Sequence, residues 1–403
     1  MRTQVTLREY ESVTVDLADT ELRGLLAADG SKALAVSPVG GGQFRLTANS
    51  LVGTVVTPHL SVLIRPKVAL ENVFLMLGVS VPSFLRSQFL YATDGGLLPA
   101  MAAVFADVVD RATVQGVLHG YRSVEERLVA PRGRVDLVEQ LRRPSTPIPA
   151  ACRFDDYTTD ILLNRGILSA ISRLSRVPAL SPQLRERLAR VRARFGDVSP
   201  AVVRAEQLDR WRPTRLDGHY ESAVRLASVV LRNLTLRDQA GAGSAASFTI
   251  DMNSVFQAFV LDRLQRVLVG RIRVVGEPSV PLSSTGSRIM SPDLVFERES
   301  SVVLVGDAKY KLSTGQARIG DYYQLLAYTT VMELDEGVLV YCQDSDDEPE
   351  HSLAVRNSGK TLWTYRLPMA GTVAQVEGQI RTLGEWVTDR TAARPLQGST
   401  VGS

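Results

Sequence analysis

Two carboxylates and one ammonium are spaced so that they meet at one end of a β-hairpin. Asp293 precedes the apolar residues 294–296, and Asp307 follows the valine-rich residues 301–305, with a short charged turn between the two segments. In an antiparallel hairpin the start of the first strand lies beside the end of the second, so the two aspartates share one end. Lys309, two positions beyond Asp307, lies on the same face of its strand.

Such a group of charges is suited to metal-dependent hydrolysis of phosphodiesters. Two close carboxylates repel each other unless one is protonated or a cation lies between them. Oxygen ligands with room for water suit Mg²⁺, of which we expect one or two ions. The metal would polarise a phosphate, and the ammonium would position a water or stabilise developing charge.

The order of these residues resembles the PD-(D/E)xK nuclease superfamily. The matching elements are Pro292-Asp293, a hairpin, and Asp307-Ala308-Lys309 at the end of an apolar strand. The alternative interpretation is a hairpin with ordinary solvated charges at its end, because a bare Asp-x-Lys is common. The upstream Pro-Asp and the strand context favour the nuclease interpretation.

A helix expected over residues 318–334 places Gln324 and Tyr328 one turn apart on one face. A Gln-x-x-x-Tyr helix directly after Asp-x-Lys resembles the RecB-like branch of that superfamily, in which the pair lies near the active site and the DNA. The alternative is that the tyrosines of this helix serve only for packing. The short distance from Asp307 and Lys309 in the sequence favours the functional interpretation.

The composition predicts a protein of the cytoplasm without a membrane segment. The chain has 403 residues, enough for two or three domains, and no apolar run long enough to span a bilayer. The N-terminus lacks the apolar region of a signal peptide. Cys152 and Cys342 are far apart and predict reduced thiols, and four isolated histidines argue against a zinc site.

Positive charge is concentrated in the middle of the chain. Residues 101–240 hold 23 arginines, no lysine and 16 acidic residues, whereas residues 241–403 hold 15 basic and 19 acidic residues. An arginine-rich middle beside an acidic C-terminal part fits a phosphate-tracking segment next to a metal site. A coding bias towards arginine over lysine accounts for the choice of residue, but not for the local excess.

We expect a multidomain α+β protein. A β-rich N-terminal domain with some helices is expected over residues 1–140, a helical Arg-rich middle region over 150–240, and an α/β domain over 248–390. The last has the order helix, three strands, helix, strand of a restriction-endonuclease-like nuclease core. Residues 391–403 are expected to be a disordered tail.

Smaller features complete this prediction. The Gly-, Ala- and Ser-rich residues 240–247 are expected to form a domain linker, and helices are expected over 83–91 and 98–115. Arg132 and Arg134 flank a glycine in a predicted turn. Their guanidinium groups suit a phosphate or a carboxylate of a partner, and a solvated hairpin is an equally good interpretation.

Taken together, the motifs resemble the McrC family, the nuclease subunits of McrBC-type modified-cytosine-dependent (type IV) restriction systems. The resemblance extends over roughly residues 5–390 and is specific through the order of its motifs. Besides the nuclease residues, the matching stretches are residues 7–11, 53–67, 125–136, 160–165 and 251–253.

The resemblance implies a partner. McrC-type subunits work with McrB, a hexameric AAA+ GTPase that carries the methylcytosine reader and translocates DNA. The N-terminal part, here residues 1–140, is implied to dock on that ring and to stimulate nucleotide hydrolysis. The C-terminal part is implied to cut double-stranded DNA, with modified DNA as the expected substrate. The sequence contains no Walker A motif, so a motor must be another chain.

Residue roles follow from the same resemblance. Asp293 and Asp307 are implied to be metal ligands, Lys309 the catalytic lysine, and the carbonyl of Ala308 a further ligand. Gln324 and Tyr328 are implied to support the site or the DNA.

One position departs from the family pattern. The first helix of the nuclease domain often offers a glutamate, whereas this chain has Gln257, a weaker and uncharged ligand. Glu277 is a possible substitute, and binding of a second metal ion depends on these two residues.

Two other functions compete with that of a partner-dependent endonuclease. The chain could be a self-sufficient RecB-like nuclease of DNA repair, in which case it would cut without a partner or nucleotide. It could also be a non-catalytic activator that docks on an AAA+ ring. The intact Asp293, Asp307 and Lys309 argue against this last alternative.

Overall fold

The computed structural model describes most of the chain. The described residues are 3–26, 30–57, 59–79, 96–142, 148–178, 180–239, 243–283, 286–310, 319–343 and 350–392. The helix expected over 83–91 lies outside them, as does the expected tail, except for Thr391 and Ala392, which end a helix.

The chain is a mixed α/β protein whose contacts divide it into two compact units. One unit comprises residues 1–3, 54–61 and 83–248, and the other comprises residues 4–53, 62–82 and 249–403. Each unit therefore combines segments that are distant in the sequence. The expected domain boundaries were drawn from composition and remain predictions.

The second unit contains a six-stranded mixed sheet in the order β12-β15-β16-β17-β19-β18. Neighbours from β12 to β16 are antiparallel, whereas β16, β17 and β19 run parallel. The elements of this part are α11 (Met252–Val267), β12 (Arg273–Val275), β13 (Val280–Pro281), β14 (Ile289–Met290), β15 (Leu294–Arg298), β16 (Ser301–Lys309), α12 (Ile319–Val331), β17 (Glu336–Gln343), β18 (Glu350–Ala354), β19 (Thr361–Pro368) and α13 (Val373–Ala392).

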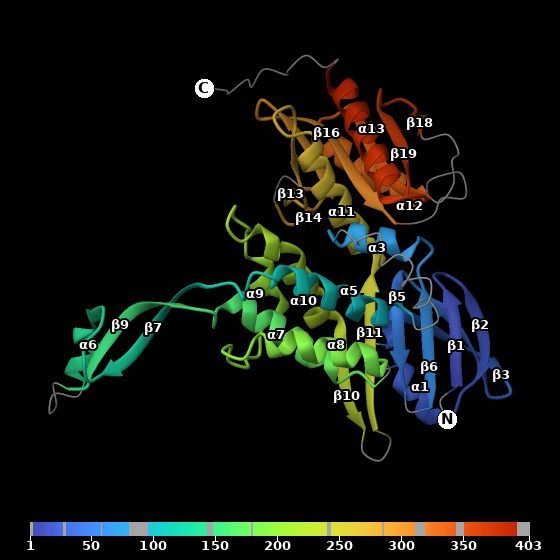
Figure 1. Ribbon diagram of the computed structural model, residues 1–403. Coiled ribbons are helices and arrows are strands. Elements are labelled where there is room, and N and C mark those ends of the chain that lie inside the picture. Colours follow the sequence, from blue (N-terminus) through green and yellow to red (C-terminus); the bar gives the residue numbers. More distant parts are fainter. Residues whose placement is uncertain are drawn as a thin grey trace. The chain divides into compact units, whose positions relative to one another are not determined.

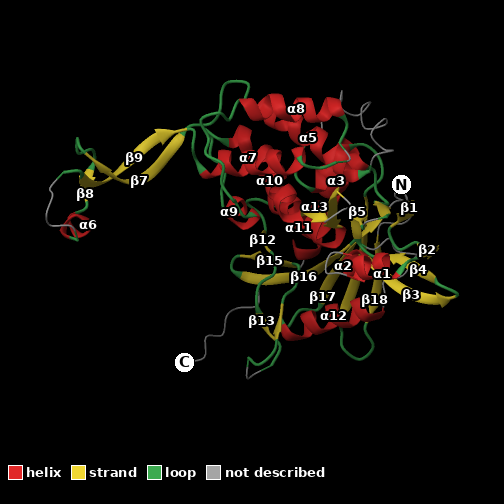
Figure 2. Ribbon diagram, turned by 90° about the horizontal axis from the view of Figure 1, so that it is seen from below, coloured by secondary structure: helices red, strands yellow, loops and turns green. Residues whose placement is uncertain are grey.

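Helices cover both faces of this sheet. Figure 2 shows the strands between α12 on one side and α11 with α13 on the other. The central strand β16 is buried on both faces, which fits the run of valine and leucine at residues 302–305. Gly337 of β17 allows α12 to approach closely, because an added Cβ would lie 2.8 Å from side-chain atoms of Leu325 and Thr329.

The N-terminal part is β-rich, as expected, but its strands belong to two sheets. One sheet has the order β2-β4-β3 and the other β1-β6-β5-β11-β10. The elements are β1 (Thr3–Arg8), β2 (Ser12–Asp16), α1 (Asp19–Leu26), α2 (Gly30–Ala33), β3 (Leu34–Gly40), β4 (Gln43–Ala48), β5 (Leu51–Val56), β6 (Leu60–Arg65) and α3 (Leu70–Met76).

The prediction of a linker over residues 240–247 is wrong for residues 243–247, the part that the structure describes. Residues 243–247 belong to β11 (Gly243–Asp251), which pairs antiparallel with β10 (Leu234–Gln239). Small side chains predicted a flexible segment. Pairing with β10 supplies the backbone hydrogen bonds that a linker would leave to water, and this pairing overrides the local preference.

The first unit contains a group of helices: α5 (Leu97–Ala112), α7 (Leu162–Ser175), α8 (Pro182–Ala193), α9 (Ala205–Asp209) and α10 (Glu221–Asn233). Helix α8 is the basic helix of the arginine-rich region. Arg187 of α8 pairs with Asp107 of α5 at 2.8 Å. Arg194, the residue that directly follows α8, pairs with Asp110 of α5 at 2.6 Å. These arginines therefore hold helices together.

A long β-ribbon extends from this helical group (Figures 1 and 2). We call residues 120–158 the arm; it consists of β7 (Gly120–Leu128), β8 (Arg134–Val135), α6 (Leu137–Leu141) and β9 (Ala150–Thr158). Strands β7 and β9 pair antiparallel from Gly120 opposite Thr158 to Leu128 opposite Ala150.

Asp160 joins the base of the arm to the helices. It accepts hydrogen bonds from Arg165 of α7, Arg122 of β7 and the backbone and hydroxyl of Ser199 at 2.6–3.0 Å. The Arg165 hydrogen bond, helped by Ser199, holds the pKa of the Asp160 carboxyl well below its usual range against the effect of burial. This network links the first strand of the arm to α7 and to Ser199.

Candidate active site

The register of the β15–β16 hairpin places the two aspartates opposite each other. Val295 pairs with Val305, so two positions further along the ladder Asp293 lies opposite Asp307 on the same face. Both are buried, with 9% and 1% of their surface exposed. Val305 belongs to the core against α12, and by alternation Asp307 and Lys309 lie on that face too.

Asp293 is held through both carboxylate oxygens. Its Oδ2 accepts the backbone N–H of Ala308 at 2.9 Å, and its Oδ1 accepts the side-chain amide of Gln257. Burial, together with the neighbouring charge of Asp307, raises the pKa of Asp293 to about 7. The charge of Asp307 is therefore close enough to oppose the ionisation of Asp293.

Lys309 connects the carboxylates with α12. Its ammonium forms an ion pair with Asp307 and donates to Oε1 of Gln324 at 3.1 Å. The amide of Gln324 donates in turn to the hydroxyl of Tyr328 at 2.7 Å. Burial disfavours the charged lysine, but the hydrogen bond and charge of Asp307 outweigh it and raise the pKa of Lys309. The side chain thus remains an ammonium at neutral pH.

Asp321 is a residue near this site that the sequence interpretation missed. It is buried on α12, accepts the hydroxyl of Tyr341 at 2.6 Å, and contributes to the raised pKa of Lys309. A signal was available, since Asp321, Gln324 and Tyr328 are spaced i, i+3, i+7 and therefore share one helix face.

Gln257 and Glu277 lie beside Asp293. The Gln257 amide donates to Asp293 and, at 2.9 Å, to Oε1 of Glu277. The backbone N–H of Glu277 donates to the carbonyl of Pro292 at 3.1 Å, which ties this loop to the start of β15. In this arrangement Gln257 bridges two carboxylates as a donor, and as a metal ligand it would present its oxygen instead.

The donors at this site fit magnesium. Among the residues that the structure describes, no group of three or more His, Cys, Asp and Glu side chains is arranged to hold a metal ion. Asp293 and Asp307, with the Ala308 carbonyl, offer a small set of hard oxygen donors. Magnesium usually binds through one or two carboxylates and completes its shell with water and substrate phosphate.

The arginines of the predicted turn belong to the arm. Arg132 pairs with Asp156 at 3.3 Å, and its guanidinium lies 4.6 Å from the centre of the Phe154 ring. Gly133 has φ +70°, and a Cβ there would lie 2.6 Å from the carbonyl of Arg153. Arg132 and Arg134 are both exposed, and their expected contact with a phosphate or partner remains a prediction.

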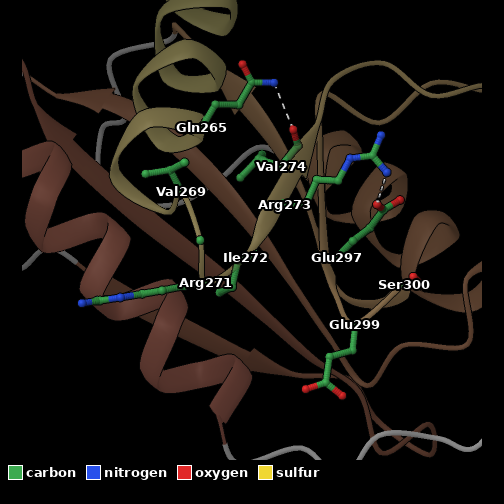
Figure 3. Close-up of a pocket in the computed structure, with 10 residues that line it drawn as sticks. Gln265, Val269, Arg271, Ile272, Arg273, Val274, Glu297, Glu299 and Ser300 are labelled. Carbon is green, nitrogen blue, oxygen red and sulfur yellow. Dashed lines mark hydrogen bonds and ion pairs between the residues drawn. The ribbon is translucent and has the colours of Figure 1, made fainter.

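A pocket of about 730 Å³ lies at the turn end of the hairpin, away from the aspartates. Figure 3 shows Arg273 of β12 paired with Glu297 there, at 2.8 Å, and the Gln265 amide donating to the Val274 carbonyl. Glu299 and Ser300 of the turn complete that side. The pocket lacks the paired carboxylates of the site, and the proposed chemistry does not use it.

Comparisons with known proteins identify a family and a solved structure with a similar fold. The family model of the McrBC 5-methylcytosine restriction system component matches residues 46–342. A solved structure described as a refined half-complex from a tetradecameric assembly of Thermococcus gammatolerans McrB AAA+ hexamers with bound McrC contains a similar chain. That chain is 18% identical, with a TM-score of 0.60 over 96% of this chain and 100% of the other.

A second structure, the cryo-EM structure of the Thermococcus gammatolerans McrBC complex, is similar over 66% of this chain and 88% of that chain, with 19% identity and a TM-score of 0.43. No curated protein matches the chain. Among the described residues, no helix is long and apolar enough to cross a membrane. The family match covers most of the chain, and the chain therefore belongs to the McrBC 5-methylcytosine restriction system components.

Proposed function

We propose that this chain is the metal-dependent DNA endonuclease subunit of a modified-cytosine-dependent restriction complex. It cuts double-stranded DNA when assembled with an McrB-like AAA+ GTPase, and it stimulates nucleotide hydrolysis by that partner. The observation that carries the proposal is the convergence of Asp293, Asp307 and Lys309 on one face of the β15–β16 hairpin, in a chain of this family.

The proposed reaction is hydrolysis of a phosphodiester of the PD-(D/E)xK type. Asp293, Asp307 and the carbonyl of Ala308 would hold magnesium, with Gln257 or Glu277 as candidate further ligands. The ion, when bound, supplies positive charge that polarises the scissile phosphate and activates water. The backbone N–H of Ala308 and the Gln257 amide keep Asp293 in place through hydrogen bonds to its two oxygens.

Lys309 supplies the remaining positive charge. The raised pKa of its ammonium, caused by Asp307 in opposition to burial, keeps it protonated. It is therefore suited to stabilise negative charge on the phosphate or to orient the attacking water. Gln324 accepts one of its hydrogen bonds and is itself oriented by Tyr328, so α12 fixes the direction of the ammonium.

The arm is the surface that we assign to the AAA+ partner. The structure similar over 96% of this chain holds McrB AAA+ hexamers with bound McrC. In this chain, α6 exposes Leu137, Val138 and Leu141, with 69%, 69% and 74% of their surface accessible, and Tyr121 and Tyr157 of the ribbon are 77% and 61% exposed. Exposed apolar side chains gathered on one element are typical of a protein interface.

Cleavage of plasmid DNA tests the proposal. The purified chain is incubated with Mg²⁺ and methylated or unmethylated plasmid, with and without an McrB-like AAA+ protein and GTP. Cutting of methylated plasmid that requires both partner and nucleotide, and that is lost in Asp307→Asn but kept in Asp16→Asn, an exposed aspartate of β2, supports it.

Two other results would assign a different function. Cutting by the chain alone would identify a self-sufficient RecB-like nuclease. Stimulated GTP hydrolysis without any cutting would identify a non-catalytic activator of the ring.

A further inference from the structure

A carboxyl group of the N-terminal segment is buried behind the candidate active site. Glu9 directly follows β1 and has no exposed surface. Its Oε2 accepts the backbone N–H of Lys67 at 2.8 Å and the hydroxyl of Tyr310 at 3.0 Å, while its Oε1 is buried and accepts no hydrogen bond from the residues that the structure describes. Burying a carboxyl oxygen without a hydrogen bond lowers the stability of the folded chain. We therefore asked what function this buried carboxyl serves.

Tyr310 is the residue that immediately follows Lys309. The ladder between β16 and β17 ends at the pair Lys309–Tyr341, so Tyr310 lies beyond the last ladder pair of its strand. Side chains alternate along a strand, and Tyr310 points to the face opposite Lys309. Its ring is buried and lies 6.0 Å, centre to centre, from that of Phe256 on α11.

The N-terminal segment also fixes the helix that carries Gln257. Asp251 caps α11 by accepting the backbone N–H of Asn253 at 3.0 Å, and the hydroxyl of Ser50 donates to the same carboxylate at 3.0 Å. The backbone N–H of Met252 donates to the Ser50 carbonyl at 3.0 Å. Two of the elements that place side chains at the site, α11 and the end of β16, are thus attached to residues far away in sequence.

We propose that Glu9 is a positioning residue of the nuclease site, which holds the end of β16 through the Tyr310 hydroxyl and thereby fixes the Lys309 ammonium against Asp307 and Gln324. The proposal rests on the proposed function, because it assigns Lys309 to that chemistry. Misplacement of a reacting group by about 1 Å lowers rates by about 10²-fold, so a hydrogen bond on the opposite face of the strand is enough to affect cutting.

The test uses the full chain with the substitutions Glu9→Leu, Glu9→Gln and Tyr310→Phe. Glu9→Leu removes the acceptor, Tyr310→Phe removes only the hydroxyl, and Glu9→Gln keeps an oxygen that accepts both hydrogen bonds. The first readout needs neither DNA nor metal. Lysines are labelled by reductive methylation with formaldehyde, and the rate at each lysine is followed by mass spectrometry.

The chain contains internal references for this labelling. Lys32 is exposed, and Lys360 donates to the carbonyls of Thr329 and Leu334 at 3.3 and 2.6 Å. We expect Lys309 to be protected in the wild type and in Glu9→Gln. In Glu9→Leu and Tyr310→Phe its rate should rise towards that of Lys32, while the rate of Lys360 stays unchanged.

The second readout is plasmid cleavage by the assembled complex at saturating DNA and Mg²⁺. We expect about a 10²-fold lower rate of cutting for Glu9→Leu and Tyr310→Phe, no further loss in the double variant because the two act through one hydrogen bond, and recovery in Glu9→Gln.

Unchanged labelling of Lys309 in Tyr310→Phe overturns the positioning role, and this variant decides the question even if Glu9→Leu does not fold. If the wild type cuts no DNA, the proposed function fails, whereas the labelling still shows whether Glu9 fixes Lys309.

Discussion

The buried carboxyl of Glu9 makes stability depend on pH in a direction that can be worked out. Burial raises the pKa of Glu9 from 4.5 to about 7, against the smaller opposing effects of the Lys67 N–H and the Tyr310 hydroxyl. The folded chain therefore binds a proton that the unfolded chain has released between these two pH values. Because the folded state binds more protons there, stability falls as pH rises through this range.

The size of the effect follows from the same pKa values. Each pKa unit corresponds to about 1.4 kcal/mol, so between pH 5 and pH 8 the titration of Glu9 removes roughly 2–3 kcal/mol of unfolding free energy. In Glu9→Gln this contribution is absent. The difference in unfolding free energy between the variant and the wild type should therefore shift by roughly 2–3 kcal/mol in favour of the variant from pH 5 to pH 8. For a unit of roughly 200 residues this corresponds to on the order of 5–10 °C in Tm.

The assay is urea and thermal denaturation of the wild type and Glu9→Gln at pH 5, 6, 7 and 8. Asp16→Asn serves as the control, since Asp16 is an exposed carboxylate on β2, and its curve should run parallel to that of the wild type. Parallel curves for the wild type and Glu9→Gln would refute the reasoning, because they would mean that Glu9 titrates alike in the folded and unfolded chain.

Three further predictions concern the site, the arm and its base. Lys309→Ala should lower DNA cleavage by about 10²-fold or more while GTP hydrolysis by the partner is still stimulated; loss of both activities would indicate a folding role, and Lys32→Ala is the exposed control. Leu137→Ser/Leu141→Ser should abolish stimulation of the partner without changing Tm, because both side chains are exposed; normal stimulation would contradict the assignment of the arm. Asp160→Ala should lower the unfolding free energy by about 1.5–3 kcal/mol, since it removes the charged hydrogen bonds from Arg165 and Arg122, which are themselves partly exposed to water; a change equal to that of Asp155→Ala, an exposed neighbour, would show that the network does not stabilise the fold.

Several elements of the structure could be predicted from short-range patterns in the sequence. The expected turn over 297–300 corresponds to the bend between β15 and β16, and the helix expected over 318–334 corresponds to α12. These agree because alternation and helical periodicity act within a few residues. The ladder register is set by the turn together with a register shift between Phe296 and Glu297, which moves Asp293 from opposite Gly306 to opposite Asp307. The proximity of Asp293 to Asp307 is a direct consequence of that register.

Other interpretations failed or were incomplete where a segment contacts another segment of the same chain that is distant in the sequence. Residues 243–247 have small side chains and look like a linker, yet β10 pairs with them and makes them a strand. The arginine excess of residues 101–240 predicted a segment that tracks phosphates, and the structure shows two of these arginines, Arg187 and Arg194, paired with aspartates of α5.

By itself, then, the sequence determined the hairpin, the helix with Gln324 and Tyr328, and the side chains that the proposed chemistry needs, because each depends on local periodicity. Only the tertiary structure decided which distant residues hold the strand and the helix that carry these side chains. Glu9 lies 301 positions from Tyr310 and Ser50 lies 201 positions from Asp251. Burial and hydrogen-bond geometry in the folded chain decide such contacts, and a carboxylate just after an N-terminal strand has no local pattern that distinguishes it from a solvated one.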